Sequence, residues 1–242
     1  MDKFEYIYGK NSCRAALKSN SSIKGCFLTN SFKDEEIISL LKNKNVIVKK
    51  VNNQYLDKMF NGGVHQGIAL KIEPYAYSSL DDILKLCENK KDALVLLLDG
   101  LEDPQNFGSI IRSCDAFGVD AIIIPSSRSV SVTASVVKVS TGAIEYVPIC
   151  KVSNLNQTID ILKQNNFWVV ASDGNGTDLY DKIDYNMKTA LIVGSEGKGI
   201  SQLTLKKSDF IVKIPLVGHV NSLNASVATG VLLAMIQKLR SN

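Results

Sequence analysis

Three polar loops carry the side chains that could do chemistry, and each follows a strongly apolar run. The first, 99–108, leads to Arg112, whose guanidinium could bind a phosphate or a carboxylate. The second, 194–200, holds three glycines, which let backbone amides approach a ligand closely. The third, within 214–228, offers Asn and Ser side chains. Because open α/β sheets bind ligands at the carboxyl ends of their strands, the loops together predict one binding site.

Each loop by itself has an ordinary explanation. An Asn or Ser before a helix is usually a cap, and a lone arginine is usually a surface residue. The glycines of 194–199 follow the order G-x-x-G-x-G, which differs from the dinucleotide fingerprint G-x-G-x-x-G. Lys198 precedes a glycine, so the loop is not a P-loop either. Glu196 would repel a phosphate but would suit a ribose hydroxyl, a cation or an arginine. Because the glycine order is not that of the dinucleotide fingerprint, a nucleotide-dependent oxidoreductase is disfavoured.

Alternating apolar and helical stretches predict how the loops are positioned. The expected strands are 93–98, 121–124, 146–149, 168–171, 190–193 and 210–214. The expected helices are 80–87, 109–117, 133–140, 155–165 and 225–238. This order is typical of an α/β domain with a parallel sheet, and it places Arg112 on the first turn of its helix.

The first 72 residues predict a smaller α/β unit. Its expected helices are 12–17, 34–42 and 54–60, and its expected strands are 25–29, 46–51 and 67–72. We interpret 73–79 as a linker and 80–242 as the second domain. Lysines interleaved with asparagines between 42 and 53 form either a solvated face or an RNA-binding face. The glycine-rich loop 61–67 is likewise either a plain turn or a ligand contact.

Composition narrows the class of protein. The chain has 242 residues and a net charge of +4, which is compatible with nucleic acid but does not require it. No segment approaches the ~18 uninterrupted apolar residues of a membrane span, and the first residues lack a signal core. The five scattered cysteines predict reduced thiols in a cytoplasmic protein. Two histidines with no cysteine nearby predict no metal site.

The loop motifs, taken together, resemble a known family. They read D-P-x-N-x-G-x-x-x-R at 103–112, G-x-E-G-x-G at 194–199 and I-P-x-x-G-x-V-x-S-L-N-x-S-V-A at 214–228. This combination is similar to the SpoU (TrmH-like) family of the SPOUT superfamily, across essentially the whole chain. The resemblance implies a parallel sheet with a C-terminal trefoil knot, S-adenosylmethionine as cofactor and a homodimer. The first 72 residues resemble the family's N-terminal RNA-binding domain.

The resemblance also assigns residues. The catalytic positions that it implies are Asn106, Arg112, Glu196, Ser222 and Asn224. The cofactor-binding positions are Gly142, Gly174, Gly194, Gly199, Ile214, Leu216, Leu223 and Asn224. His219 departs from the motif and receives no role. We expect Arg112 to orient the ribose hydroxyl and its phosphate, Glu196 to hold Arg112 through a paired bond, and Ser222 and Asn224 to fix the ribose and the methionine part of the cofactor.

The expected reaction is 2′-O-methylation of a ribose in large-subunit ribosomal RNA, at a guanosine. A tRNA ribose methyltransferase is an alternative, although the N-terminal unit argues against it. A catalytically inactive RNA-binding relative is a second alternative, opposed by the intact catalytic positions. Apolar residues cover much of the last helix, more than one buried stripe requires, which supports a dimer. They are Val227, Val231, Leu232, Ala234, Met235 and Leu239.

Overall fold

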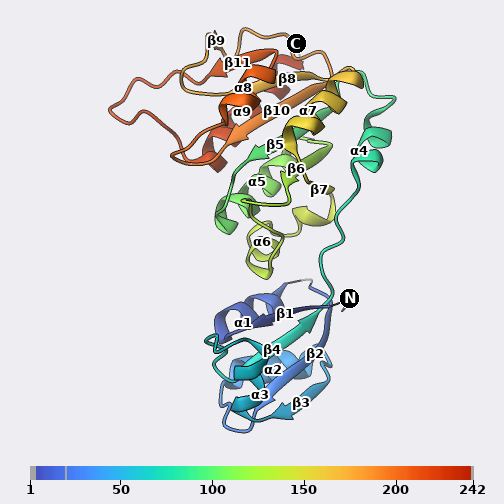
Figure 1. The fold of residues 1–242 in the computed structure, drawn as a ribbon, viewed down its shortest axis with the longest axis vertical. Coiled ribbons are helices and arrows are strands. Elements are labelled where there is room, and N and C mark those ends of the chain that lie inside the picture. Colours follow the sequence, from blue (N-terminus) through green and yellow to red (C-terminus); the bar gives the residue numbers. More distant parts are fainter. Residues whose placement is uncertain (1–3, 20, 241–242) are drawn as a thin grey trace. The chain divides into compact units, whose positions relative to one another are not determined.

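The chain folds into two compact units in the computed structural model, which describes residues 4–19 and 21–240 (Figure 1). One unit comprises the chain up to Ala76 together with residues 132–139. The other comprises residues 77–131 and the chain from Ser140 onward. The boundary between the units at 76–77 falls within the predicted linker. Ser79, the last residue of that linker, already caps the next helix, because its side chain accepts a hydrogen bond from the Asp82 backbone N–H.

The N-terminal unit is a mixed sheet with helices on both faces. Its strands, in spatial order, are β1 (Glu5–Tyr8), β4 (Ile68–Ile72), β2 (Ile23–Thr29) and β3 (Val48–Val51). Its helices include α1 (Lys10–Lys18), α2 (Glu35–Asn43) and α3 (Asn53–Met59). Side chains of α1 and α2 share a core with Cys26, Leu28 and Leu70. Strand β1 was not predicted, because four residues containing a Glu and two tyrosines give little apolar signal.

The second unit is built on a parallel sheet. Its strands, in spatial order, are β7 (Ile149–Val152), β6 (Ala121–Pro125), β5 (Leu94–Asp99), β10 (Thr189–Gly194), β8 (Trp168–Ser172), β11 (Phe210–Lys213) and β9 (Asp178–Leu179). Their pairings are all parallel. The helices are α4 (Leu80–Cys87), α5 (Pro104–Ala116), α7 (Leu155–Gln164), α8 (Gln202–Lys207) and α9 (Ala225–Arg240). The predicted α/β class with a parallel sheet is confirmed.

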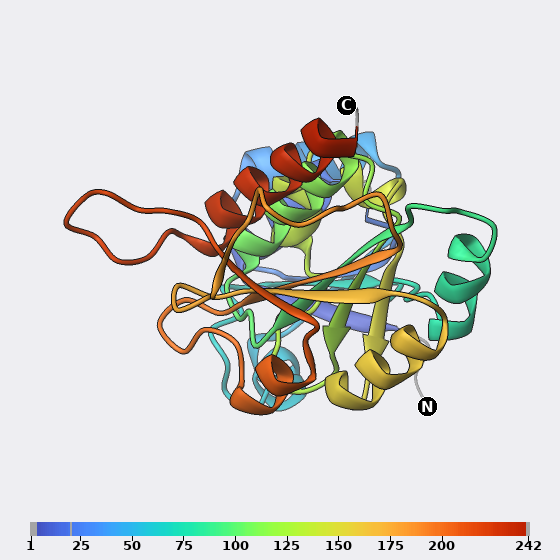
Figure 2. The ribbon, with the colours of Figure 1, turned by 90° about the horizontal axis from the view of Figure 1, so that it is seen from above.

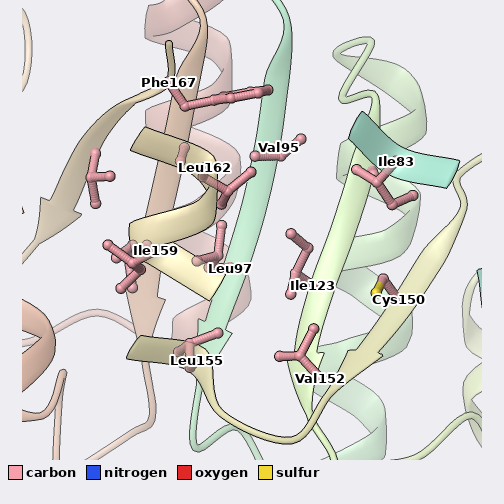
Figure 3. Close-up of a cluster of buried hydrophobic side chains, with 14 of the residues drawn as sticks. Ile83, Val95, Leu97, Ile123, Cys150, Val152, Leu155, Ile159, Leu162 and Phe167 are labelled. Carbon is pink, nitrogen blue, oxygen red and sulfur yellow. The ribbon is translucent and has the colours of Figure 1, made fainter. Parts of the chain in front are cut away.

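Both faces of this sheet are covered, so its strands are apolar throughout rather than alternating. Helices α5 and α9 lie side by side on one face, and α7 and α8 lie on the other (Figure 2). On the α7 face, Val95, Leu97 and Ile123 pack against Ile159 and Leu162 in one buried cluster (Figure 3). This rigid sheet fixes the strand ends from which the polar loops emerge.

Helix α5 begins earlier than predicted, at Pro104 rather than Ser109. The carboxylate of Asp103 accepts hydrogen bonds from the backbone N–H groups of Gln105 and Asn106, both at 3.1 Å. A proline at the first helical position costs no hydrogen bond there, so Asp103 and Pro104 form a strong helix start. The prediction that Arg112 lies on the first turn is therefore wrong, since it lies more than two turns into the helix.

The predicted strand 146–149 is also wrong. Gly142 adopts a left-handed conformation with φ of 96° and starts the 3₁₀ turn Ala143–Glu145. Strand β7 then begins at Ile149, directly after Pro148, whose missing N–H cannot join a sheet ladder. Helix α6 (Ala134–Val139) completes the described elements. Helix α8 and strand β9 were not predicted.

The cysteines are free and buried. Burial raises the pKa of the Cys13 and Cys26 thiols to about 12 and that of Cys87 and Cys150 to about 11. We expect the native protein at pH 8 to react with a thiol reagent at least about tenfold more slowly than the unfolded chain, because little thiolate forms. Absorbance of the released reagent group, with and without denaturant, measures this. Fast labelling of native protein would contradict it.

Among the described residues, no helix has the length and the apolar character needed to cross a membrane.

Candidate active site

The polar loops meet at one edge of the parallel sheet. Strands β5 and β10 are neighbours, and Gly194 at the end of β10 is in register with Asp99 at the end of β5. Strand β8 pairs with β10 on its other side, and β11 pairs with β8. The carboxyl ends of all these strands therefore face the same side, which is where such sheets bind ligands.

A cavity of about 160 Å³ lies among these loops. Its lining includes six predicted cofactor residues, namely Gly174, Gly194, Gly199, Ile214, Leu216 and Leu223. Two predicted catalytic residues, Glu196 and Ser222, also line it. Asn224 borders an adjoining groove that shares Glu196, Ser222 and Leu223 with the cavity. Gly142 is not among the described residues that line either space.

Glu196 is the centre of a hydrogen-bond network that joins two distant helices. Its Oε1 accepts from Asn106 Nδ2 at 3.0 Å, from Asn224 Nδ2, and from the Ala225 backbone N–H at 3.4 Å. Asn224 Nδ2 also lies 2.9 Å from Asn106 Oδ1, to which it donates. The carboxylate, the first turn of α5 and the amino end of α9 are thereby held in one arrangement. Among the described residues, Glu196 Oε2 accepts no hydrogen bond and remains available to a ligand.

Asn224 has two roles in this network. Its Oδ1 accepts from the backbone N–H groups of Ser226 and Val227, at 2.9 and 3.3 Å, and so caps helix α9. Its Nδ2 points to Glu196 and Asn106. The cap uses Oδ1 and the site contact uses Nδ2 of the same amide group. The bonds at the start of α9 therefore fix the direction in which Nδ2 points.

The glycine loop that carries Glu196 folds back on itself. Ser195 and Gly199 exchange backbone hydrogen bonds of 3.3 and 3.0 Å. Gly197 and Gly199 have positive φ angles of 82° and 64°, which side-chain-bearing residues rarely adopt. A Cβ on Gly194 would lie 2.3 Å from the Gly199 carbonyl carbon. Close backbone packing, rather than side chains, therefore shapes this wall of the cavity.

Arg112 is not part of this arrangement within one chain. Arg112 follows Asn106 by six positions in α5, so the two side chains point in directions about 120° apart around the helix axis. It is exposed, and among the described residues it has no hydrogen-bond or ion-pair partner. The expected pairing of Glu196 with Arg112 is therefore wrong within one chain, where Glu196 bonds the amides of Asn106 and Asn224 instead.

Several lining residues were missed by the sequence reasoning. Asp173, Ser172, Ser195 and Asn221 add polar groups to the cavity, and Ala228 adds an apolar contact. The signal for Asp173 was present, because Asp173-Gly174 lies one residue beyond the apolar strand predicted at 168–171, where a ligand loop would lie. The described residues contain no group of three or more His, Cys, Asp and Glu side chains that could hold a metal ion.

Comparisons with known proteins match both units. The family described as "SpoU rRNA Methylase family" matches residues 93–234, and "RNA 2'-O ribose methyltransferase substrate binding" matches residues 6–78. A putative TrmH family tRNA/rRNA methyltransferase of Staphylococcus aureus (strain COL) is 45% identical over 238 residues, which cover 97% of this chain and 96% of that protein.

Two solved structures are also similar. The AdoMet-bound rRNA methyltransferase from Sinorhizobium meliloti has a TM-score of 0.66 and 25% identity, covering 98% of this chain and 87% of that one. The A. aeolicus TrmH/SpoU tRNA modifying enzyme has a TM-score of 0.57 and 29% identity, covering 67% of this chain and 82% of that one. The family match spans more than half of the sequence and the curated relative matches it nearly end to end. This chain therefore belongs to the SpoU rRNA methylase family of RNA methyltransferases.

Proposed function

We propose that this protein transfers the methyl group of S-adenosylmethionine to a ribose 2′-hydroxyl of large-subunit ribosomal RNA, at a guanosine. The observation that carries the proposal is the network in which Glu196 is held by Asn106 and Asn224 at the wall of the cavity. All three are positions that the family resemblance assigns to catalysis.

The chemistry of the cavity lining suits this cofactor. Its lining combines apolar side chains, such as Ile214 and Leu223, with the polar groups of Asp173 and Asn221. A mixed lining suits a molecule with a flat heteroaromatic ring at one end and hydroxyl, ammonium and carboxylate groups at the other. A Cβ on Gly174 would meet no atom within 4 Å, so this glycine leaves room in the cavity. When bound, the cofactor supplies a sulfonium methyl group that is already activated.

The residues of the chain then have two tasks, alignment and proton removal. Glu196 Oε2, the free oxygen of the fixed carboxylate, would accept the hydrogen bond of the attacking hydroxyl and take up its proton as the methyl group is transferred. Ser222 would hold the ribose. Arg112 would orient the hydroxyl and its neighbouring phosphate through its fork of N–H groups. A guanidinium holds its proton strongly and is a poor proton acceptor, so we assign Arg112 a positioning role.

Ribosomal RNA is favoured over tRNA by the N-terminal unit. The substrate-binding family covers residues 6–78, and the rRNA methyltransferase of S. meliloti covers nearly the whole chain. The A. aeolicus tRNA modifying enzyme covers 67% of it. The tRNA reaction remains the second candidate, since the S. aureus relative is named for both substrates. An inactive relative is opposed by the intact network around Glu196.

We also place a trefoil knot in the chain from β10 to α9. In its support, the amino end of α9 returns to the β10 loop through the bond from Asn224 to Glu196, after β11 has paired with β8. We further infer a cytoplasmic location, where ribosomal RNA and reduced thiols are both found.

We infer a homodimer from an apolar stripe on α9. Val227 is 51% exposed, Ala234 is exposed, and Val231 and Met235 are partly exposed at helical spacing between and beside them. The loop before α9 extends away from the rest of the second unit (Figure 2). Val217 and Val220 in this loop are exposed. Apolar surface of this extent marks an interaction site.

Replacing both Val227 and Ala234 by glutamate is expected to raise the dimer dissociation constant at least about 100-fold, because unpaired charges would be buried. Analytical ultracentrifugation measures the change. Gln202→Glu, on the exposed part of α8, adds a negative charge elsewhere and should leave the dimer intact. A double variant that sediments as the wild-type protein does would contradict the interface.

The proposed reaction is tested by methyl transfer from labelled S-adenosylmethionine to total RNA from a strain that lacks this protein. Digested products are read for 2′-O-methylguanosine in large-subunit ribosomal RNA, which is the expected result. Label in tRNA would retain the chemistry and overturn the substrate. Absence of both cofactor binding and label would support the inactive alternative.

A further inference from the structure

We propose that the α3 face of the N-terminal sheet is a stacking platform for unpaired bases of the RNA substrate. The platform consists of Phe4, Tyr6, Phe27 and Tyr55 with Lys49 and Lys71. The proposal rests on the proposed function, because it names the part of the chain that holds the RNA and the state of that RNA.

Successive side chains of a strand point to opposite faces of the sheet, which shows which residues share each face. Cys26 and Leu28 of β2 are buried with α1 and α2. The residue between them, Phe27, must point to the opposite face. Phe27 is in register with Ala69 of β4 and Lys49 of β3, and Tyr6 of β1 is in register with Lys71 of β4. Aromatic and basic side chains therefore share the face away from α1 and α2.

Helix α3 covers this face only in part. Leu56 of α3 is fully buried, but Tyr55, one residue earlier, is 44% exposed. The Phe27 ring lies between two others, with its centroid 6.2 Å from that of Tyr6 and 5.8 Å from that of Tyr55. Tyr6 and Phe27 are themselves partly exposed. A continuous row of rings thus reaches solvent instead of closing into a core.

Positive charge accompanies the rings. Lys49 Nζ lies 5.9 Å from the centre of the Tyr55 ring, and Lys71 Nζ lies 3.9 Å from the centre of the Phe4 ring. The paired rows that form this face contain no acidic residue. Glu73, at the end of β4, is neutralised by Lys24 at 3.1 Å. The surface therefore complements a polyanion.

Rings and ammonium groups on one open sheet face suit single-stranded RNA better than a duplex. Unpaired bases can stack on aromatic rings while their phosphates meet lysines, and this recognition tolerates any sequence. In a duplex the base faces are already stacked on one another. The occupant that fits is an unpaired segment of the RNA substrate.

The test measures binding of a labelled single-stranded RNA oligonucleotide of mixed sequence to the full chain, by fluorescence anisotropy. Tyr55→Ala is expected to weaken binding about tenfold, through loss of one stacked base, and Tyr55→Phe is expected to restore it. Lys49→Gln is expected to weaken binding and to lower the salt slope by about 0.7. In methyl transfer, both weakened variants should raise KM for RNA and leave kcat unchanged.

Lys50 provides the matched control. It is exposed on the same strand as Lys49 but in register with Leu28, so it belongs to the other face. Lys50→Gln should bind RNA as the wild-type protein does. Equal losses from Lys49→Gln and Lys50→Gln would show a general charge effect and overturn the platform. So would Tyr55→Ala with unchanged KM in an active enzyme. A wild-type protein that methylates no RNA would instead overturn the proposed function.

Discussion

Arg112→Ala is expected to abolish methyl transfer, with a fall in kcat of at least about 1000-fold, and to leave the cofactor dissociation constant within about twofold. The two quantities respond differently because of where Arg112 lies. Arg112 is exposed and does not line the cavity, so its removal disturbs neither the fold nor the cofactor site. Its fork can orient the hydroxyl and the adjacent phosphate only when RNA is bound. Single-turnover methylation and calorimetric cofactor titration measure the two quantities.

Arg112→Lys separates charge from geometry. A lysine retains the positive charge but cannot make two parallel hydrogen bonds, so we expect only partial activity. Near-normal turnover in the alanine variant would remove Arg112 from the mechanism altogether.

The proposed dimer would offer a way for Arg112 to reach an active site. Its neighbour Ser113 lies beside Gly230 of α9, next to the apolar stripe that we place in the interface. Mixed dimers of Arg112→Ala and Glu196→Ala chains test this route. If the arginine acts on the partner's site, one of the two sites contains every wild-type residue and activity returns. If it acts within its own chain, the mixture stays inactive.

The parts of the site that could be predicted are those with a local signal. The apolar runs 93–98 and 190–193 predict buried strands because they are too apolar for a half-exposed position, and both are confirmed as β5 and β10. A polar loop after each run places Asn106 and Glu196 at the sheet edge. The structure brings their side chains to 3.0 Å.

The parts that could not be predicted depend on packing between distant segments. Ninety residues separate Asn106 from Glu196, and no pattern along the chain states that an amide, rather than Arg112, bonds the carboxylate. The position of Arg112 depended on where α5 starts. Asp103-Pro104 held that information, but Phe107 and Gly108 resemble a loop until their burial within α5 is seen.

Gly194→Ala is expected to produce the second large effect, a loss of both stability and cofactor binding. The new Cβ would lie 2.3 Å from the Gly199 carbonyl carbon and 2.6 Å from the Ile200 nitrogen. Both are backbone atoms, so no side chain can move aside. We expect the free energy of unfolding to fall by about 1–3 kcal/mol and cofactor affinity to fall at least about 100-fold.

Two other glycines make the prediction specific. Gly218→Ala adds its Cβ where no atom lies within 4 Å and away from the cavity, so it should change neither quantity. Gly174→Ala also meets no protein atom, but Gly174 lines the cavity, so we expect the added methyl group to reduce the room there. It should keep wild-type stability and still weaken cofactor binding, which separates filling the cavity from distorting its wall.

Thermal melting and cofactor titration of the three variants decide between these effects. Gly194→Ala should melt below the other two, because only there does the backbone of the 194–200 loop have to move. That movement would displace Glu196 from Asn106 and Asn224, so methyl transfer should be lost even at saturating cofactor. A Gly194→Ala protein with wild-type stability and activity would mean that the loop can open without cost. The network around Glu196 would then be held from α5 and α9 alone.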